Sequence, residues 1–366
     1  MSLLARRLAA VMAGALFTLV HMPAAWAQGL YAEKTIKLII NFAPGGAADT
    51  EGRIFARYLA PLIEGKPTIL PQNIAGSGGL AATNQLGRAG KDGLSLGYLT
   101  GIGARAAFEP EFFQTPFPQF RMVAYIEGAT IYYVRSDVEP GIRQPPDIMK
   151  AQKLFVGGLS VGSSKDLTMR LTLDMLGVGY GYITGYSGAG PLRLAFESRE
   201  VNLLSDGRAT YNSTILPMVE AGAVLPLWVD TGYDGMSLFV PRANRDMDLL
   251  PFHELYQKIK GMPPSGQLWE AYLSLLASNT MLQRIVAFPP ETPELYVQEL
   301  RRAIASLNKD PDFLNATSRQ FGYVPEYETG SDVQSKIERM TQVSDQMREF
   351  VKKYISDGQR RGDLPN

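Results

Sequence analysis

The chain has 366 residues, no cysteine, and equal numbers of acidic and basic side chains, with 36 Asp and Glu against 36 Lys and Arg. The lack of cysteine excludes a disulfide framework, a cysteine-anchored lipoprotein and a thiolate metal site. The balanced charge, with no basic tract, argues against nucleic-acid binding. Only two histidines are present, so we predict neither a metal site nor a bound cofactor.

The N-terminus has the pattern of a secretory signal peptide. A pair of arginines precedes an apolar run, Leu8 to Val20, which is too short for a membrane span of about 20 residues. Small residues follow at Ala25 and Ala27, the two positions that a signal peptidase reads. We therefore predict a signal peptide over 1–27, cleavage before Gln28 and a free protein in the bacterial periplasm. A membrane anchor or a twin-arginine signal fits this segment less well.

Glycine-rich turns recur after predicted strands. The first follows the apolar strand Ile36 to Phe42, breaks at Pro44 to Gly46, and precedes apolar residues at helical spacing from Ile54 to Ile63. A helix N-terminus has backbone N–H groups without internal partners and the positive end of the helix dipole, so such a turn is a candidate anion site. The simpler interpretation is a tight connection between a strand and a helix. Further turns of this kind lie near residues 76–79, 100–103, 157–164 and 185–190.

The repeated strand–turn–helix units predict two α/β domains with mostly parallel sheets. Ligands in such sheets bind beyond the carboxyl ends of the strands, so a cleft between the domains would be lined by backbone amides from both sides. We predict that domain 1 comprises 30–132 and 232–366 and that domain 2 comprises 133–231, with two crossover strands as the hinge. From Leu249 onward the pattern is mainly helical, and the region 241–280 has no assigned role.

A hydrolase is the alternative function. Gly158 to Gly162 matches G-x-S-x-G between a strand and a helix, which is the pattern of a nucleophile elbow. Ser160 would be the nucleophile, with His253 and either Asp206 or Asp230 as its partners. Against this, His253 lies at a predicted helix start, and the pattern arises easily among glycine-rich turns.

In their order along the chain, the motifs resemble the substrate-binding proteins of the tripartite tricarboxylate transporter (TctC, or Bug) family. The resemblance covers nearly all of the mature chain. The chain differs by having Asp166 where the family usually has histidine and Asn202 where it usually has aspartate. The matching motifs are Ile36-Lys37-Leu38-Ile39, Phe42-Ala43-Pro44-Gly45-Gly46 with Asp49, Asn73 with Gly76-Ser77-Gly78-Gly79, Asp92-Gly93, Gly162-Ser163 and Tyr186-Ser187-Gly188-Ala189-Gly190-Pro191.

The resemblance implies a two-lobed type II periplasmic binding protein of the Venus-flytrap kind, without enzymatic activity. It implies capture of a small organic carboxylate, either a di- or tricarboxylate or an aromatic acid, and delivery by a monomer to the permease subunits of a tripartite transporter. The ligand-binding residues predicted from the turns and from the resemblance are Phe42, Ala43, Pro44, Gly45, Gly46, Ala47, Asp49, Ser77, Gly78, Thr100, Gly101, Ser160, Gly162, Ser163, Ser164, Tyr186, Ser187, Gly188 and Asp206.

Two predictions leave alternatives open. Asp49 would repel a bare carboxylate, so it either braces its loop, accepts from a ligand hydroxyl or bridging water, or caps the following helix. The pair Tyr132 and Tyr133 either stacks on a ligand or, as aromatic residues more often do, belongs to the core.

Overall fold

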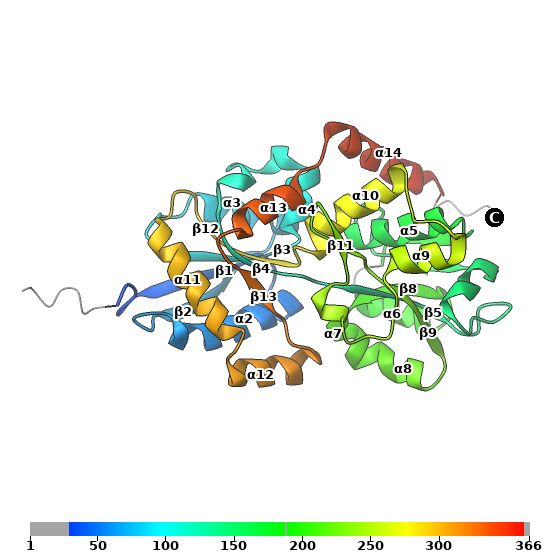
Figure 1. Ribbon diagram of the computed structural model, residues 1–366, viewed down its shortest axis with the longest axis horizontal. Helices are drawn as coiled ribbons and strands as arrows, with labels where there is room; N and C mark the ends of the chain where they lie inside the picture. The colour runs from blue at the N-terminus through cyan, green and yellow to red at the C-terminus, as the bar shows by residue number, and fades with distance from the viewer. Residues whose placement is uncertain (1–28, 187–188, 362–366) are drawn as a thin grey trace, which may run out of the picture.

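The computed structural model describes residues 29–186 and 189–361, which form two sheets with helices on both faces (Figure 1). The predicted signal peptide and its cleavage site lie outside the described residues. Within the described ranges, no helix combines the length and the apolar character needed to cross a bilayer.

The first sheet has six strands in the order β13-β4-β12-β3-β1-β2. β1 runs parallel to β2 and β3, whereas β12 is antiparallel to both β3 and β4, and β13 is antiparallel to β4. The carboxyl ends of β1, β2 and β3 therefore meet at one edge, and the N-terminal end of β12 lies beside them. The strands are β1 (Thr35–Ile40), β2 (Thr68–Asn73), β3 (Ser95–Thr100), β4 (Arg121–Ile126), β12 (Arg284–Phe288) and β13 (Tyr327–Thr329).

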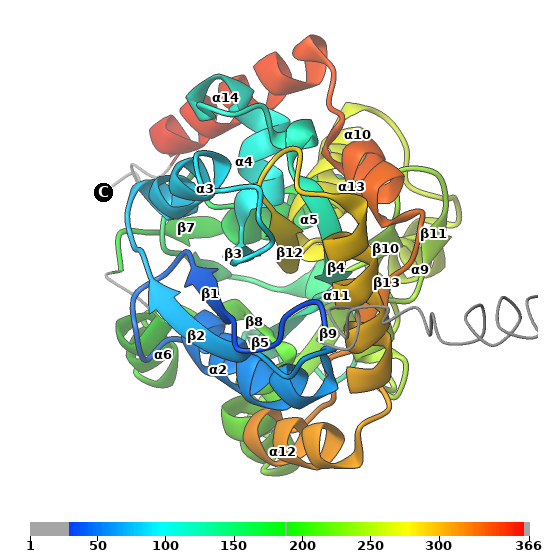
Figure 2. The same cartoon turned by 90° about the vertical axis from the view of Figure 1, so that its left-hand side faces the viewer.

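Helices cover both faces of this sheet (Figure 2). Alternate strand residues face opposite ways, so Leu38 packs in the core on one face and its neighbour Ile39 packs in the core on the other. One face carries α2 (Ala47–Leu59), α11 (Glu294–Leu307) and α12 (Pro311–Phe321). The other carries α3 (Leu80–Gly87), α4 (Ile102–Phe108) and α13 (Val333–Thr341).

The second sheet has five strands in the order β7-β6-β8-β5-β9. β6 is parallel to β7 and β8, and β5 is antiparallel to β8 and β9. The strands are β5 (Thr130–Arg135), β6 (Phe155–Gly157), β7 (Gly181–Ile183), β8 (Leu203–Gly207) and β9 (Val224–Val229). The helices along the chain between them are α5 (Ser164–Leu176), α6 (Ala189–Glu197), α7 (Arg208–Thr210) and α8 (Leu216–Glu220).

Three later helices also belong to the core of the second sheet, although the predicted domain 1 included all of 232–366. They are α9 (Phe252–Lys260), α10 (Gln267–Leu275) and α14 (Asp345–Arg361). Their aromatic side chains cover the face that Tyr132 and Trp228 present, with the Trp228 and Phe252 rings 5.7 Å apart. The chain therefore passes between the two sheets more often than at two crossover strands.

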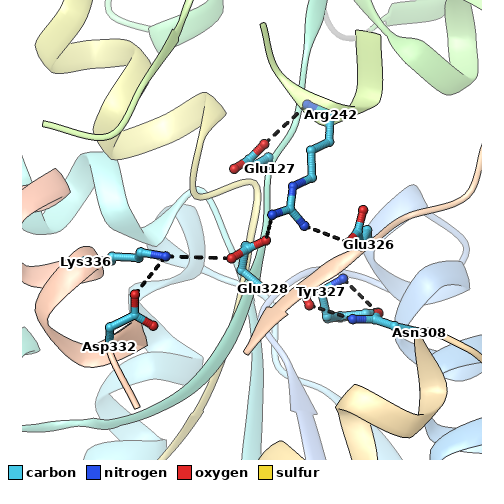
Figure 3. A network of polar contacts seen from close by, with 8 residues as sticks. All are labelled: Glu127, Arg242, Asn308, Glu326, Tyr327, Glu328, Asp332 and Lys336. Atoms are coloured by element: carbon cyan, nitrogen blue, oxygen red, sulfur yellow. Dashed lines mark hydrogen bonds and ion pairs between the residues drawn. The ribbon is translucent and has the colours of Figure 1, made fainter. Parts of the chain in front are cut away.

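The segment that leaves β9 forms a small antiparallel pair, β10 (Gly232–Tyr233) and β11 (Leu238–Phe239), and is tied to the first sheet by Arg242 (Figure 3). The backbone N–H of Arg242 donates to Glu127 at 3.3 Å, and its guanidinium pairs with Glu326 at 2.7 Å and with Glu328. Glu127 directly follows β4 and Glu328 lies on β13, so one arginine joins three segments where the chain leaves the first sheet.

Candidate ligand-binding cleft

The loop after β1 is open to solvent, as its glycines predict. Residues 42–47 are exposed, whereas Asn41 beneath them is buried. The Asn41 amide donates to the Thr100 carbonyl at 2.8 Å and accepts from the Thr100 N–H at 2.9 Å, which joins the ends of β1 and β3. Gly46 is the N-cap of α2, with extended backbone angles and no side chain to cover the first helical amides.

Asp49 braces this loop. Its carboxylate accepts from the Gly45 N–H at 2.9 Å, from Arg53 at 2.8 Å and from Asn73 at 3.0 Å. The Arg53 hydrogen bond, helped by those of Gly45 and Asn73, lowers the pKa of Asp49 to about 2. Gly46 is the N-cap of α2, so Asp49 does not cap this helix. The contacts of its carboxylate agree with the alternative in which Asp49 braces the loop.

The second turn contains four consecutive residues with positive φ, Gly76 to Gly79. Such angles favour glycine, and at Gly79 a Cβ would also lie 2.2 Å from the Asn41 amide nitrogen. The turn therefore lies directly on the first loop. The third turn begins α4 with Gly101 at φ 68°.

The fourth turn, residues 157–164, follows a strand of the second sheet and is held, like the first turn, by an aspartate of the helix that follows it. Ser163 caps α5 by accepting from the Asp166 N–H at 3.2 Å. The Asp166 carboxylate accepts from the Ser160 N–H at 2.8 Å and from the Tyr182 hydroxyl at 3.0 Å. This gives a structural role to the aspartate that stands where the related family usually has histidine.

A cavity of about 390 Å³ lies between the two sheets at these turns. Of the predicted ligand-binding residues it brings together Gly78, Gly101, Gly162, Ser163 and Ser164. The other lining residues were not predicted from the sequence, and they are Ala104, Arg105, Phe108, Glu109, Lys165, Leu167, Leu275, Asn279, Val351 and Ile355.

Several predicted residues lie outside this lining. The first loop, 42–47, is at the same edge of the first sheet but does not line the cavity. Asp206 accepts from the Tyr133 hydroxyl at 2.7 Å and pairs with the cavity-lining residue Lys165 at 3.4 Å. Tyr186 donates to Glu200 at 2.7 Å. Ser77, Thr100 and Ser160 do not line the cavity either, and Ser187 and Gly188 lie outside the described residues.

The sequence analysis did not name two cationic residues that line the cavity, Arg105 and Lys165, although their positions in the sequence pointed to them. Arg105 lies one helical turn after Gly101, and Lys165 lies in the first turn of α5, so both follow directly from turns that were identified. The alternative role for Tyr132 and Tyr133 as stacking residues is wrong, because both side chains are fully buried.

The proposed triad of a hydrolase has no shared contacts. The His253 ring contacts the Thr231 hydroxyl at 3.1 Å, and Asp206 is held by Tyr133 and Lys165. Ser160 lies within the segment from Gly157 to Ser164, not at a sharp strand-to-helix turn. In the described part of the chain, moreover, no three His, Cys, Asp or Glu side chains are arranged to hold a metal ion.

Comparison with known proteins finds relatives by sequence. No family model matches the sequence. The chain is 28% identical over 305 residues to a UPF0065 protein from the ttuE-ttuC' intergenic region of Agrobacterium vitis, which covers 78% of this chain and 86% of that protein. It is 36% identical over 66 residues to protein BugT of Bordetella pertussis, covering 18% of this chain and 20% of that protein.

Solved structures share the fold across most of the chain. The periplasmic binding protein BugD matches with a TM-score of 0.57 and 21% identity, over 88% of this chain and 98% of that one. A TctC solute-binding protein from Polaromonas, without ligand, matches with a TM-score of 0.60 and 19% identity over the same shares. Rpa4515 of R. palustris, solved with adipate, matches with a TM-score of 0.59 and 21% identity, over 88% and 97%.

The fold is therefore that of a two-lobed periplasmic binding protein, as predicted. The family resemblance drawn from the motifs is also confirmed. The chain is similar in sequence to a UPF0065 protein and, over 66 residues, to BugT, and it shares its fold with a TctC solute-binding protein.

Proposed function

We propose that this chain is a solute-binding protein that captures a small organic carboxylate in the cleft between its lobes. The observation that carries the proposal is the start of α5. There Ser163, which is the N-cap, and Ser164 and Lys165, the first two residues of the helix, line one cavity. Amides, hydroxyls and a cation all favour a bound anion. Rpa4515, which has the same fold, was solved with adipate.

The wider role follows from this binding. The protein would bind its ligand in the periplasm, after removal of residues 1–27, and deliver it as a monomer to the permease subunits of a tripartite transporter. We assign no catalytic activity to it. Lobe 1 would hold the first sheet, and lobe 2 would hold 133–231 together with α9, α10 and α14, since these helices share its core. The loop 42–47, Asp206 and the turn at 185–190 would complete the site when the lobes close.

A thermal-shift screen tests the proposal. The mature protein is heated with a panel that includes adipate, succinate, malate, citrate, benzoate and phenylacetate, and with the matching neutral amides. A ligand that binds only the native state raises the melting temperature by mass action. We expect at least one acid to raise it and its amide not to. A panel in which no acid has an effect would contradict the proposal.

A further inference from the structure

Asp230 lies where three connections between the lobes meet. It directly follows β9 of lobe 2, and its backbone N–H donates at 3.0 Å to the carbonyl of Thr130, the first residue of β5. Its carboxylate accepts from the Thr280 hydroxyl at 3.3 Å, and Thr280 lies between α10 of lobe 2 and β12 of lobe 1. The Asp230 side chain is fully buried. A buried carboxylate therefore belongs to the hinge.

A line of polar contacts runs from this carboxylate to the first turn of α5. The Tyr132 hydroxyl lies 2.8 Å from the Asp230 carboxylate and 3.0 Å from the Thr168 hydroxyl. The Thr168 hydroxyl lies in turn 3.0 Å from the Lys165 carbonyl oxygen. Tyr132 and Thr168 are both buried, so water does not compete for these contacts.

The line continues through one peptide group into the cavity. The peptide group that holds the Lys165 carbonyl also holds the Asp166 N–H, which donates to the Ser163 hydroxyl oxygen at 3.2 Å. Because this oxygen accepts from Asp166, the Ser163 hydroxyl can donate its own hydrogen elsewhere. Ser163 lines the cavity between the lobes. The contacts thus join the hinge to the candidate ligand site.

The number of hydrogens in this line depends on the protonation of Asp230. The contacts Asp230 to Tyr132, Tyr132 to Thr168 and Thr168 to the Lys165 carbonyl each need one hydrogen. The two hydroxyls supply one each and an ionised carboxylate supplies none, so two hydrogens serve three contacts. A protonated Asp230 supplies the third. Each group can then donate to the next in the direction of α5.

The titratable neighbours of Asp230 are two tyrosines and a histidine one residue away. Burial raises the pKa of Tyr132 on β5 and of Tyr272 on α10 well above the usual value, so both hydroxyls keep their hydrogen. Burial raises the pKa of Asp230 to about 6. His253, at the start of α9, contacts the Thr231 hydroxyl, and burial lowers its pKa. The titration of His253 therefore needs its own control.

We propose that Asp230, Tyr132 and Thr168 are positioning residues of the cleft, and that the protein takes up one proton from solvent at Asp230 when an anion binds at Ser163. An anion that accepts from Ser163 favours donation along the whole line toward α5, since hydrogen bonds in a chain polarise one another. That arrangement needs the proton, and by linkage the proton tightens anion binding by the same factor. This inference rests on the proposed function and goes beyond it, because it couples the ligand site to the hinge.

Nuclear magnetic resonance of the ligand-free protein tests the line itself. In a deuterated, ¹⁵N-labelled sample, the amide resonance of Asp166 should shift with pH, with its midpoint near the Asp230 pKa of about 6. Thr168→Val, which replaces the hydroxyl by a methyl group, should remove this titration although Asp230 and Tyr132 are unchanged. His253→Gln should retain it. A titration that persists in Thr168→Val would overturn the inference.

Calorimetric titration with adipate and with benzoate, at pH 5.5 and pH 7.5, tests the coupling. Proteins are compared at the same pH, so the ionisation of the acid itself cancels. Asp230→Asn, whose amide supplies a hydrogen at every pH, should match wild type at pH 5.5 and bind at least about fivefold more tightly than wild type at pH 7.5. Thr168→Val should bind more weakly than wild type at pH 5.5 and equally at pH 7.5.

Stability separates this role from a purely structural one. Urea unfolding of Thr168→Val should keep the pH dependence that Asp230 gives to wild type, because the contact between Asp230 and Tyr132 remains. A ratio of wild-type to Asp230→Asn affinity that is the same at both pH values would overturn the inference and leave a carboxylate-binding protein. Failure of wild type to bind any acid in the thermal-shift panel would overturn the proposed function and the coupling with it.

Discussion

Asp49 and Asp166 have the same place in the two lobes. Each is the third residue of a helix that follows a glycine turn, and each carboxylate accepts from a backbone N–H of that turn, at 2.9 Å for Gly45 and at 2.8 Å for Ser160. A carboxylate in the first helical turn is stabilised by the helix dipole. In each lobe, the carboxylate of the helix therefore fixes the glycine turn that precedes it.

Asp49→Asn should therefore lower stability more than ligand affinity. An amide cannot replace the carboxylate toward Gly45, Arg53 and Asn73 together, and we expect a loss of about 1 kcal/mol in the free energy of unfolding. Because folding lowers the pKa of Asp49 to about 2, its contribution is fully present above the ordinary value of 3.8 and is lost as the pH falls through about 2. The measurement is urea unfolding of both proteins at several pH values.

Asp248→Asn, at an exposed position, is the matched control for this experiment and should change nothing. Unchanged stability of Asp49→Asn together with a tenfold loss of ligand affinity would show that Asp49 contacts the ligand instead.

Gly46→Val should abolish ligand binding with little effect on the fold. Gly46 has φ −84° and ψ 174°, which valine adopts, and a Cβ would find only the Ala43 carbonyl, at 3.9 Å. Its branched side chain would cover the first amides of α2. The loss of one or two charge-assisted hydrogen bonds, each of about 1.5–3 kcal/mol, corresponds to more than tenfold in affinity. Calorimetric titration with the best acid from the panel measures it.

Gly79→Val provides the contrast. At Gly79 φ is +94° and a Cβ would lie 2.2 Å from the Asn41 amide, so this variant should lose stability as well as binding. Wild-type affinity in Gly46→Val would show that the first loop takes no part in the site.

Asp230 should give the protein a pH-dependent stability. It is fully buried where β9 leaves the second sheet, and it accepts from Tyr132 at 2.8 Å and from Thr280 at 3.3 Å. Burial raises its pKa from 3.8 to about 6. The folded state therefore binds this proton more tightly than the unfolded state does, and stability falls as the pH rises from about 4 to about 6.

Asp230→Asn removes this titration. Relative to wild type, the variant should gain up to about 3 kcal/mol in unfolding free energy between pH 4 and pH 7. Denaturant unfolding at the two pH values checks this. A difference between the two proteins that stays constant with pH would show that Asp230 titrates normally.

The sequence predicted the parts of the fold that depend on local chemistry. Glycine turns and strand ends follow from residue type and spacing, and the strand expected from Ile36 is β1, which begins at Thr35. β4 and β5 follow each other closely along the chain but belong to two different sheets. Residue patterns show that a strand is buried, but not which sheet it joins.

Long-range packing explains what the sequence did not reveal. The sequence indicated a mainly helical pattern from Leu249 onward, but such a pattern does not show which sheet each helix covers. The return of α9, α10 and α14 to lobe 2 depends on how Trp269 and Tyr272 fit against Phe252, with ring centroids 6.5 and 5.4 Å away. For the same reason, the sequence did not identify Val351 and Ile355 as lining residues of the cavity. They lie more than 150 residues along the chain from Gly162 and Ser163, which line the same cavity.

The proposed binding function also predicts that the protein has no esterase activity. Wild-type protein should not turn over short-chain p-nitrophenyl esters above the rate of buffer, because the His253 ring contacts Thr231 and Asp206 is held by Tyr133 and Lys165. A spectrophotometric assay measures this. Turnover that disappears in both Ser160→Ala and His253→Ala would contradict a purely binding role.

A solute-binding protein of this kind should recognise a carboxylate by its charge. Calorimetric titration of wild type at neutral pH with phenylacetate and with phenylacetamide, which keeps the ring and removes the charge, tests it most directly. We expect the acid to bind with a stoichiometry of one and the amide at least tenfold more weakly, since hydrogen bonds to a charged group contribute about 1.5–3 kcal/mol each. Equal affinity for the acid and the amide would contradict the account.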